Sequence, residues 1–269
     1  MKRIMTFFAV SVLLVACSRN AITGRKQLTL YPESEITAAA QQQYQQFLSQ
    51  SKVVSPSGSR DAEMVRRVGQ RIANAITQYY TQQGLANEVS GYNWEYNLVD
   101  SKEVNAWCMP GGKIVVYTGL LPISQNEAAL AVVLGHEIAH ALAHHGNERM
   151  SQAAVQQLGG QALSVAVANK SAAAQNILLG AYGIGSNVGA LLPFSRKQEL
   201  EADHYGLIFA AMAGYNPQEA IPLWERMKAA AGSSKPPEIL STHPAEDTRI
   251  QKLREMMPEA MQYYKPVGK

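Results

Sequence analysis

The stretch "LGHEIAHALAHHGNERM", residues 134–150, concentrates the titratable side chains of the chain and decides how the rest is interpreted. It holds four of the six histidines of the 269-residue sequence, together with two glutamates. Ser124 and Glu127 upstream have the spacing of a capping box, and an apolar run follows them. We therefore predict one long helix over about 125–145, which ends at the glycine that follows.

Helical spacing selects the histidines that can share a metal ion. His136 and His140 are four residues apart, so their side chains lie one turn apart on one face. His144 lies eight residues from His136, about 12 Å along the axis, so one ion cannot reach both. Glu137 follows the first histidine as in H-E-x-x-H, where it can take a proton from water. The rival pair His140 and His144 has no such base, and we expect His144 and His145 to finish the helix.

A zinc enzyme that hydrolyses peptides keeps three protein ligands, so one more is needed. The pattern H-E-x-x-H-x-x-G-x-x-H does not fit, because its glycine and third histidine are missing here. The stretch "ELEAD", 199–203, offers Glu199 as a ligand on a second helix, with Asp203 one turn on to accept the N–H of a ligand histidine. Glu201 lies about 200° around that helix and cannot join them. The alternative is that these glutamates are solvated helix charges.

Two further histidines lie outside the first stretch. His243, in "LSTHPAEDTRI", could stabilise the oxyanion of a tetrahedral intermediate or occupy the open zinc position in a resting state. It could also simply precede a helix that begins at Pro244. His204 neighbours Asp203 but points about 100° away from it, so we expect packing or a supporting contact to a ligand, and not ligation.

Apolar periodicity predicts more helices and a small sheet around this site. The tract 151–194 carries a single charged residue, Lys170, and suits a helical hairpin, either packed on the core or acting as a lid or binding surface. Ser195 and Gln198 form a second capping-box pattern. The predicted elements are helices over 33–50, 60–80 and 195–213, from Pro217 and from about Pro244, and strands over 92–100 and 113–118.

The first residues read as a targeting leader. Lys2 and Arg3 precede a short apolar run, 4–16, that is too short to span a bilayer comfortably. "LVAC", which ends at Cys17, resembles a bacterial lipobox, and this resemblance implies cleavage before Cys17 and lipidation of its thiol. An ordinary secretory signal is the alternative. Ser18 after the cysteine favours sorting to the outer membrane, so the expected location is its periplasmic face, lipid-anchored.

Composition and charge exclude some partners. The formal net charge is +3 and falls by two if Lys2 and Arg3 are removed, so the chain has no electrostatic attraction for nucleic acid. With Cys17 lipidated, Cys108 is the only thiol left and no intrachain disulfide is possible. Stability must then come from the core and from a metal.

The two motifs together resemble a known family of zinc metallopeptidases, which includes HtpX, BepA, LoiP, mitochondrial Oma-type proteases and CAAX prenyl proteases. The resemblance covers nearly the whole chain after the leader, and the LoiP-like periplasmic lipoproteins are the nearest subgroup. Trp107 and Cys108 stand where the family often has a Phe-Ala pair. The stretches that carry the resemblance, besides "HEIAH" and "ELEAD", are "NAITGRKQLTL" (20–30), "VNAWCMPGGKIVVYTGLL" (104–121), "PFSRKQELEADHYGL" (193–207) and "STHPAEDTRI" (241–250).

The resemblance implies an α+β, mostly helical, thermolysin-like zincin with a small β-sheet and an active-site helix. Residues 105–108 would form an edge strand beside the cleft, to which a peptide could add. We expect a signal peptide over 1–16, a polar tether over 17–31 and one metallopeptidase domain over 32–269.

The expected function is that of an endopeptidase with one Zn²⁺ per chain. It would cleave unfolded or misassembled envelope proteins in protein quality control, with His136, His140 and Glu199 as ligands and Glu137 as the base. The alternative is a periplasmic chaperone or assembly factor that binds unfolded chains and has a latent or structural zinc site. A hydrolase with a non-peptide substrate is a third option. The sequence does not predict an oligomeric state.

Overall fold

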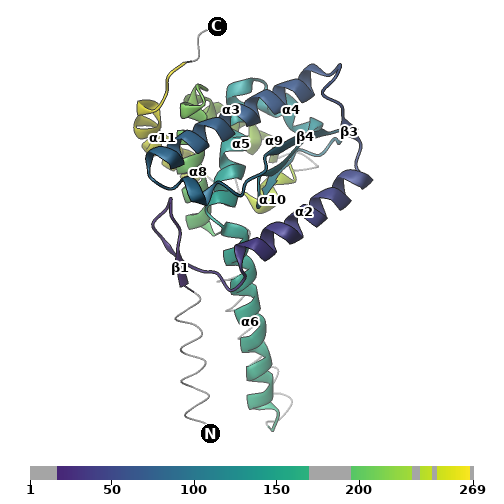
Figure 1. Cartoon of the computed structure of the whole chain (residues 1–269), viewed down its shortest axis with the longest axis vertical. Coiled ribbons are helices and arrows are strands. Elements are labelled where there is room, and N and C mark those ends of the chain that lie inside the picture. Colours follow the sequence, from purple (N-terminus) through teal and green to yellow (C-terminus); the bar gives the residue numbers. More distant parts are fainter. Residues whose placement is uncertain (1–16, 170–194, 232–236, 244–246, 267–269) are drawn as a thin grey trace.

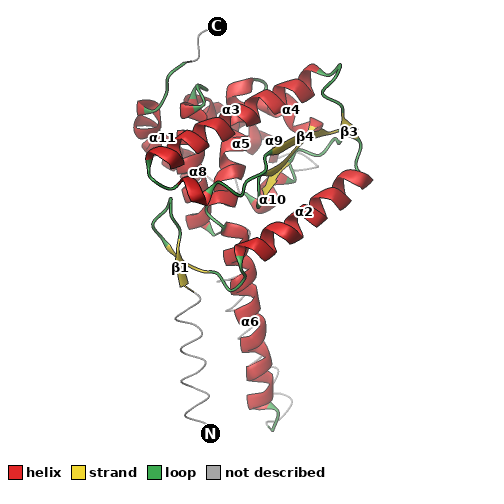
Figure 2. Ribbon diagram, viewed as in Figure 1, coloured by secondary structure: helices red, strands yellow, loops and turns green. Residues whose placement is uncertain are grey.

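The computed structural model describes residues 17–169, 195–231, 237–243 and 247–266. Helices dominate and two small sheets accompany them (Figure 2), which confirms the expected α+β class. The strands are β1 (Cys17–Arg19), β2 (Lys26–Leu28), β3 (Val53–Val54), β4 (Glu95–Val99), β5 (Ala106–Met109) and β6 (Lys113–Tyr117). The α-helices are α2 (Glu33–Gln50), α3 (Arg60–Gln82), α4 (Leu121–Ser124), α5 (Glu127–Leu142), α6 (His145–Val167), α8 (Arg196–Met212), α9 (Ala220–Ala231), α10 (Ile239–Thr242) and α11 (Asp247–Gln262). Short 3₁₀ turns are η1 (Ala86–Glu88), η2 (Thr118–Leu120) and η3 (Pro217–Glu219).

The larger sheet has four strands in the order β3-β4-β6-β5. β4 pairs with β6 in parallel, and β5 pairs with β6 in antiparallel register. Gly111 and Gly112 have φ of +83° and +85°, a backbone conformation that favours glycine, and make the tight turn between these two strands. β5 is thus an edge strand, as the family resemblance implied.

Helix α5 lies at the centre of the molecule and is buried from Ala129 to its end. In Figure 1 the helices α3 and α8 lie beside it. Leu130, Leu134 and Ile138 recur at helical spacing and are completely buried in the main core. Burial on all sides explains why the helix is apolar around its whole circumference, the metal-binding motif excepted.

Helices α5 and α8 approach each other through two glycines. A Cβ atom added at Gly135 would lie 2.6 Å from the carbonyl oxygen of Gly206, and one added at Gly206 would lie 2.7 Å from the amide nitrogen of His136. Both separations are shorter than real Cβ contacts allow. The absence of a side chain at both positions therefore lets the two backbones touch beside the first histidine of the motif.

The start of α5 differs from the sequence prediction. Its N-cap is Asn126, whose side chain accepts a hydrogen bond from the amide of Ala129, and not Ser124. Ser124 instead ends the short helix α4, and Gln125 adopts a left-handed φ of +66° that separates the two helices. Asn and Ser are equally good N-caps, so cap preference does not choose between Asn126 and Ser124. The position of Asn126, three residues before the amide of Ala129, sets the helix boundary.

The end of α5 also differs. The helix stops at Leu142, and His144 has a left-handed φ of +53° that turns the chain into α6, which begins at His145. The last carbonyls of α5 accept hydrogen bonds from distant side chains: Asn20 donates to Leu142 at 3.1 Å, and Gln27 donates to Ala143 at 2.6 Å. These tertiary caps end the helix three residues earlier than sequence periodicity predicts.

Residues 17–28 form a hairpin with tertiary contacts, within the range 17–31 that was expected to be a polar tether. β1 and β2 form an antiparallel hairpin that lies against the junction of α5 and α6 (Figure 1). Asn20 and Gln27, which donate to the end of α5, are both buried. The hairpin is therefore part of the packed structure. The expected signal peptide, 1–16, lies outside the described residues.

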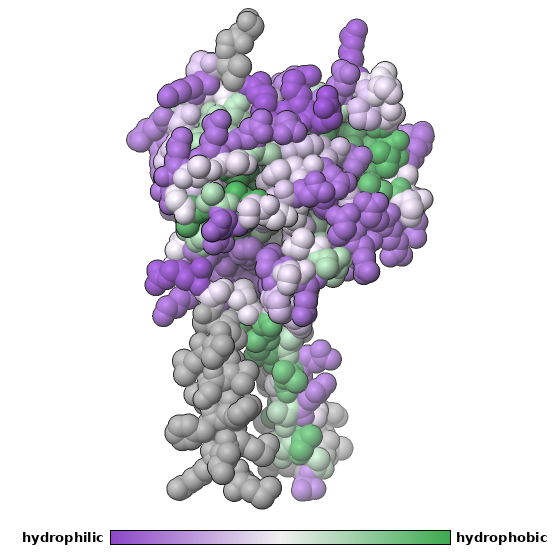
Figure 3. All heavy atoms as spheres, in the orientation of Figure 1, coloured by the Kyte–Doolittle hydropathy of each residue, from purple (hydrophilic) through white to green (hydrophobic). Residues whose placement is uncertain are grey.

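Helix α6 extends away from the body of the molecule (Figure 1). Figure 3 shows hydrophobic surface along this helix. Two of its apolar residues, Leu158 and Val165, are 62% and 78% exposed. Of the tract 151–194, for which packing on the core and a lid or binding surface were both left open, residues 170–194 lie outside the described residues. None of the described helices combines the length and hydropathy that crossing a membrane requires.

The other predicted helices are observed. Ser195 caps α8 through a full capping box with Gln198, and Gly214 follows its end with a φ of +81°. α2 spans the predicted range, and α3 extends the predicted range by two residues. Pro217 opens a 3₁₀ turn that leads directly into α9.

The glycine contact between α5 and α8 predicts the effect of a single methyl group. Gly206→Ala should lower the free energy of unfolding by about 1–3 kcal/mol, because the added Cβ must push the two helices apart. Urea unfolding followed by circular dichroism measures it. Gly146→Ala is the matched control. Gly146 lies in α6, where an added Cβ meets no atom within 4 Å and should not destabilise the protein. Equal stability of the two variants would contradict the close approach.

Candidate metal centre

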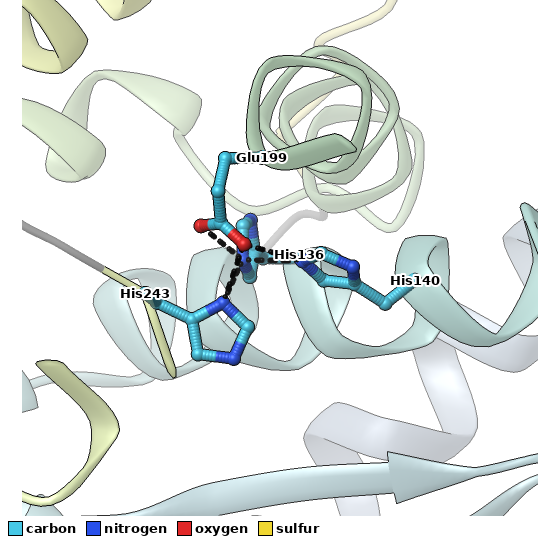
Figure 4. A group of neighbouring side chains, drawn as sticks. All are labelled: His136, His140, Glu199 and His243. Carbon is cyan, nitrogen blue, oxygen red and sulfur yellow. Dashed lines mark hydrogen bonds and ion pairs between the residues drawn. The ribbon is translucent and has the colours of Figure 1, made fainter. Parts of the chain in front are cut away.

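Four side chains from separate parts of the chain converge beside α5. His136 and His140 project from one face of α5, Glu199 comes from the first turn of α8, and His243 follows α10 (Figure 4). One ligand atom of each residue lies within 4.8 Å of all the others, and all four residues are buried. The structure therefore brings together the three sequence-predicted ligands and His243.

The separations suit one tetrahedral ion. His136 Nε2 lies 3.1 Å from both His140 Nε2 and His243 Nδ1. Glu199 Oε1 lies 3.2 Å from His140 Nε2 and 2.9 Å from His243 Nδ1. A tetrahedral zinc ion with bonds near 2.0–2.1 Å holds neighbouring ligand atoms about 3.3 Å apart. The three imidazole nitrogens and one carboxylate oxygen thus form a donor set of the right size and chemistry for zinc.

Asp203 orients the first histidine. Its Oδ1 lies 2.9 Å from His136 Nδ1, so a proton on Nδ1 is held by the carboxylate and Nε2 faces the other ligands. Glu199 and Asp203 stand one turn apart on α8, as their spacing predicts. This arrangement fixes both the ring orientation and the tautomer that a metal ligand requires.

Arg249, on α11, is a member of the site that the sequence reasoning missed. Its Nε and Nη2 each donate to Asp203 at 2.7 Å, and its Nη1 lies 2.8 Å from Glu199 Oε2. The guanidinium also stacks on Trp224, 3.7 Å from the ring centroid. A physical argument could have predicted such a residue, because two buried carboxylates that face the same histidine need a buried cation.

The electrostatics of the cluster favour a divalent cation. Burial lowers the pKa of His136, but hydrogen bonds to Asp203 and Glu199 outweigh it and raise that pKa to about 9. Burial lowers the pKa of His140 well below its ordinary value, which keeps the ring neutral. Three carboxylates, those of Glu137, Glu199 and Asp203, are buried together, and the guanidinium of Arg249 pairs with two of them, Glu199 and Asp203. A bound divalent ion would balance the remaining charge and replace the proton on His136.

Glu137 lies beside the cluster without belonging to it. It is buried, and its Oε1 has no hydrogen-bond partner among the described residues. Burial raises the pKa of this carboxyl above its ordinary value. His243 Nε2 lies 3.7 Å from this Oε1. Such a carboxylate is poised to accept a proton from a group that enters the site.

The other histidines of the sequence have different surroundings. His144 lies 3.1 Å from Glu33, and His204 lies 2.9 Å from Glu259 at the surface, so neither reaches the cluster. His145, which was expected only to finish α5, is completely buried behind His140. Cys17 begins β1 in the N-terminal hairpin.

Comparison with known proteins places the chain in a family. The model of "Peptidase family M48" matches residues 59–257. The mitochondrial metalloendopeptidase OMA1 of Schizosaccharomyces pombe is 40% identical over 174 residues, 64% of this chain and 49% of that protein. OMA1 of Danio rerio is 32% identical over 265 residues, 96% of this chain and 54% of that protein. The β-barrel assembly-enhancing protease of Escherichia coli is 32% identical over 184 residues, 65% of this chain and 37% of that protein.

The chain belongs to peptidase family M48. This confirms the metallopeptidase class that the H-E-x-x-H and E-x-x-x-D motifs indicated. The chain spans about half the length of the curated relatives it matches. The narrower likeness to the LoiP-like lipoproteins is not confirmed by the comparisons.

The expected location at the bacterial outer membrane is wrong. The matched proteins include mitochondrial metalloendopeptidases from yeasts, a plant and vertebrates, and the comparisons give no support for a lipid anchor. The prediction rested on four residues, 14–17, after a short apolar run. A pattern of that length is too short to specify a compartment by itself.

The donor set predicts how metal content depends on Glu199. Glu199→Gln should lower the zinc bound after dialysis well below one ion per chain, because an amide oxygen is a neutral and weaker donor. Atomic emission on the purified protein measures the ratio of zinc to protein. Glu259→Gln, a surface carboxylate on α11, is the matched control and should keep full zinc. An unchanged ratio in the Glu199 variant would exclude this residue as a ligand.

The buried guanidinium predicts a large stability effect. Arg249→Met should lower the free energy of unfolding in chelator by about 3–5 kcal/mol, because Asp203 and Glu199 lose their cation while the apolar contact with Trp224 is kept. Urea unfolding in excess chelator provides the measurement. Arg254→Met removes an exposed ion pair with Glu225 and should cost at most about 1 kcal/mol. Similar losses for both variants would contradict the role of Arg249 as the buried counter-charge.

Proposed function

We propose that this chain is a zinc-dependent endopeptidase that cleaves unfolded segments of proteins. The observation that carries the proposal is the position of Glu137, a buried carboxylate directly beside the four-residue donor set, with one oxygen that accepts no hydrogen bond from any described residue. A structural metal site needs no such base. Membership of peptidase family M48 supports the same chemistry.

The geometry of the site assigns a separate role to each of its residues. His136, His140 and Glu199 would hold the ion, which supplies Lewis acidity for the attacking water and the peptide carbonyl. Glu137 would accept the proton of that water and pass it to the amine that leaves. Burial raises the pKa of Glu137, which makes its carboxylate a better proton acceptor. Asp203 would keep His136 aligned throughout, and Arg249 would hold Asp203 and Glu199 in place.

His243 Nδ1 lies at the fourth position of the tetrahedral donor set. Its Nδ1 lies 2.9 Å from Glu199 Oε1 and 3.1 Å from His136 Nε2, where a catalytic zinc site keeps its open position. Of the alternatives considered for this residue, the distances favour a closed resting state. Water and substrate would enter only after the ring withdraws, and the ring would then be free to hydrogen-bond the developing oxyanion.

The edge strand β5 offers a way to hold a peptide. β5 pairs with β6 on one side and forms the border of the four-stranded sheet, with Ala106 buried and Trp107 and Cys108 partly exposed. A peptide that adds to such an edge is bound through its backbone, so many sequences can be accepted. Only an extended, unfolded segment presents its backbone in this way. Unfolded or misassembled proteins are therefore the substrate class we propose.

A binding protein without catalysis is the rival. The name of the E. coli relative, a β-barrel assembly-enhancing protease, joins assembly with cleavage in one protein. A purely binding role would leave the buried carboxylate of Glu137 without a purpose, although its burial costs free energy. We therefore favour cleavage, and the two functions separate in a single experiment.

Glu137→Gln should keep bound zinc and lose peptide-bond cleavage by at least about 100-fold, because the amide cannot accept the proton. Digestion of unfolded casein, with the fragments identified by mass spectrometry, provides the measurement. Chelator should abolish cleavage by the unmodified chain, and added zinc should restore it.

The same assay should be run in the His243→Ala background, so that a closed site is not mistaken for an inactive one. Cleavage by the Glu137→Gln variant at the unmodified rate would reject Glu137 as the base. No cleavage by the zinc-loaded chain, with or without His243, would favour the binding function instead.

A further inference from the structure

His145 stands directly behind a proposed zinc ligand. It is completely buried at the first position of α6. Its Nδ1 lies 2.9 Å from His140 Nδ1, and its Nε2 lies 3.0 Å from Glu201 Oε2. One face of this imidazole thus meets the nitrogen of His140 that points away from the cluster, and the other meets a carboxylate.

The bond from His140 to the ion fixes the direction of these hydrogen bonds. When Nε2 of His140 gives its lone pair to a metal, the ring proton resides on Nδ1 and must be donated. His145 Nδ1 then accepts it, which leaves the proton of His145 on Nε2. That N–H in turn donates to Glu201. Each group therefore has one role, and the network is satisfied only in this order.

The N-terminal hairpin holds the far end of this network. Arg25 donates through Nε to Glu201, at 2.7 Å to Oε1 and 3.0 Å to Oε2. Its Nη1 and Nη2 each donate to Glu148 at 2.6 Å, a bidentate pair. Gln198 adds a hydrogen bond to Glu148 at 2.8 Å. Arg25 therefore connects α6 and α8 behind the cluster.

The break between α5 and α6 allows His145 to contact His140. In a continuous helix, residues five apart point about 140° from each other, so His145 could not return to His140. The left-handed φ of His144 breaks the helix and redirects the chain, which makes the contact possible. Asn20 and Gln27, from the same hairpin as Arg25, cap the carbonyls that this break exposes.

We infer that His145 is a positioning residue for the zinc ligand His140, and that Glu201 and Arg25 complete a relay which fixes its tautomer and orientation. His136 receives this support directly from Asp203, whereas His140 receives it through a second imidazole. Arg25 lies outside residues 59–257, so the relay extends the site beyond the segment that the family model matches. The inference rests on the proposed zinc site.

Two substitutions of His145 separate hydrogen bonding from packing. His145→Phe keeps a planar ring but removes both nitrogens, and it should weaken zinc affinity about 10–100-fold. His145→Asn keeps an oxygen that can accept from His140, so it should recover part of that loss although it packs worse. Zinc affinity is measured by competition with a chromogenic chelator. A packing role would reverse the order, with Phe near the unmodified affinity and Asn the weaker binder.

The hairpin is tested by a matched pair of arginines. Arg25→Met should lower zinc affinity several-fold, because Glu201 loses the cation that orients it. Arg19→Met is the control: Arg19 lies in the same hairpin, and its Nη1 donates to the carbonyl of Gly24 at the surface. Equal affinity in both variants would remove Arg25 from the relay.

The tautomers can be observed without any substitution, which guards against variants that fail to fold. In the zinc-loaded chain with ¹⁵N-labelled histidine, long-range nitrogen–proton correlations should show His140 protonated at Nδ1 and His145 protonated at Nε2. A proton on His145 Nδ1 would overturn the inference. If the unmodified chain binds no zinc at all, the proposed function fails instead, and this outcome is seen in the affinity assay before any variant is compared.

Discussion

The contact between Gly135 and Gly206 sets the distance on which the metal centre depends. It brings the backbones of α5 and α8 together beside His136. Asp203 and Glu199 stand about one and two turns before Gly206 on α8, so the contact also brings their carboxylates to the histidines. Larger residues at the crossing would separate side chains that must approach within about 3.3 Å to hold one tetrahedral metal ion. Packing of two small residues thus determines the chemistry of several charged ones.

Close approach has an electrostatic cost that the rest of the site offsets. Three carboxylates are buried within one small volume, and burial alone would favour their neutral forms. Arg249 supplies one positive charge from α11, and its stacking on Trp224 helps to hold it there. The remaining negative charge draws a proton onto His136, whose pKa is about 9, or draws a cation. The affinity for metal is therefore a property of the whole buried cluster and not of the ligands alone.

The sequence predicted the parts of this site that local spacing governs. His136, Glu137 and His140 on one helix, and Glu199 with Asp203 on another, follow from the period of 3.6 residues. The boundaries of α5 were not predictable in the same way, because its last carbonyls are capped by Asn20 and Gln27 from a segment more than a hundred residues away in sequence. Arg249 and the hairpin residue Arg25 were missed for the same reason. Both lie in stretches that carry the family resemblance, 20–30 and 241–250, but their roles exist only in tertiary contacts, which local spacing does not predict.

The position of these arginines bears on when the site can exist. Arg25 and Arg249 lie near opposite ends of the described chain, and the carboxylates that they contact lie between them in sequence. Domains generally fold as units during synthesis, and contacts between distant segments form late. A growing chain whose α11 has not yet emerged from the ribosome has both histidines of the motif, but Glu199 and Asp203 still lack the guanidinium of Arg249. The metal centre would therefore be completed only after α11 has emerged from the ribosome, and a nascent chain that stops before α11 would carry both motifs without an assembled site.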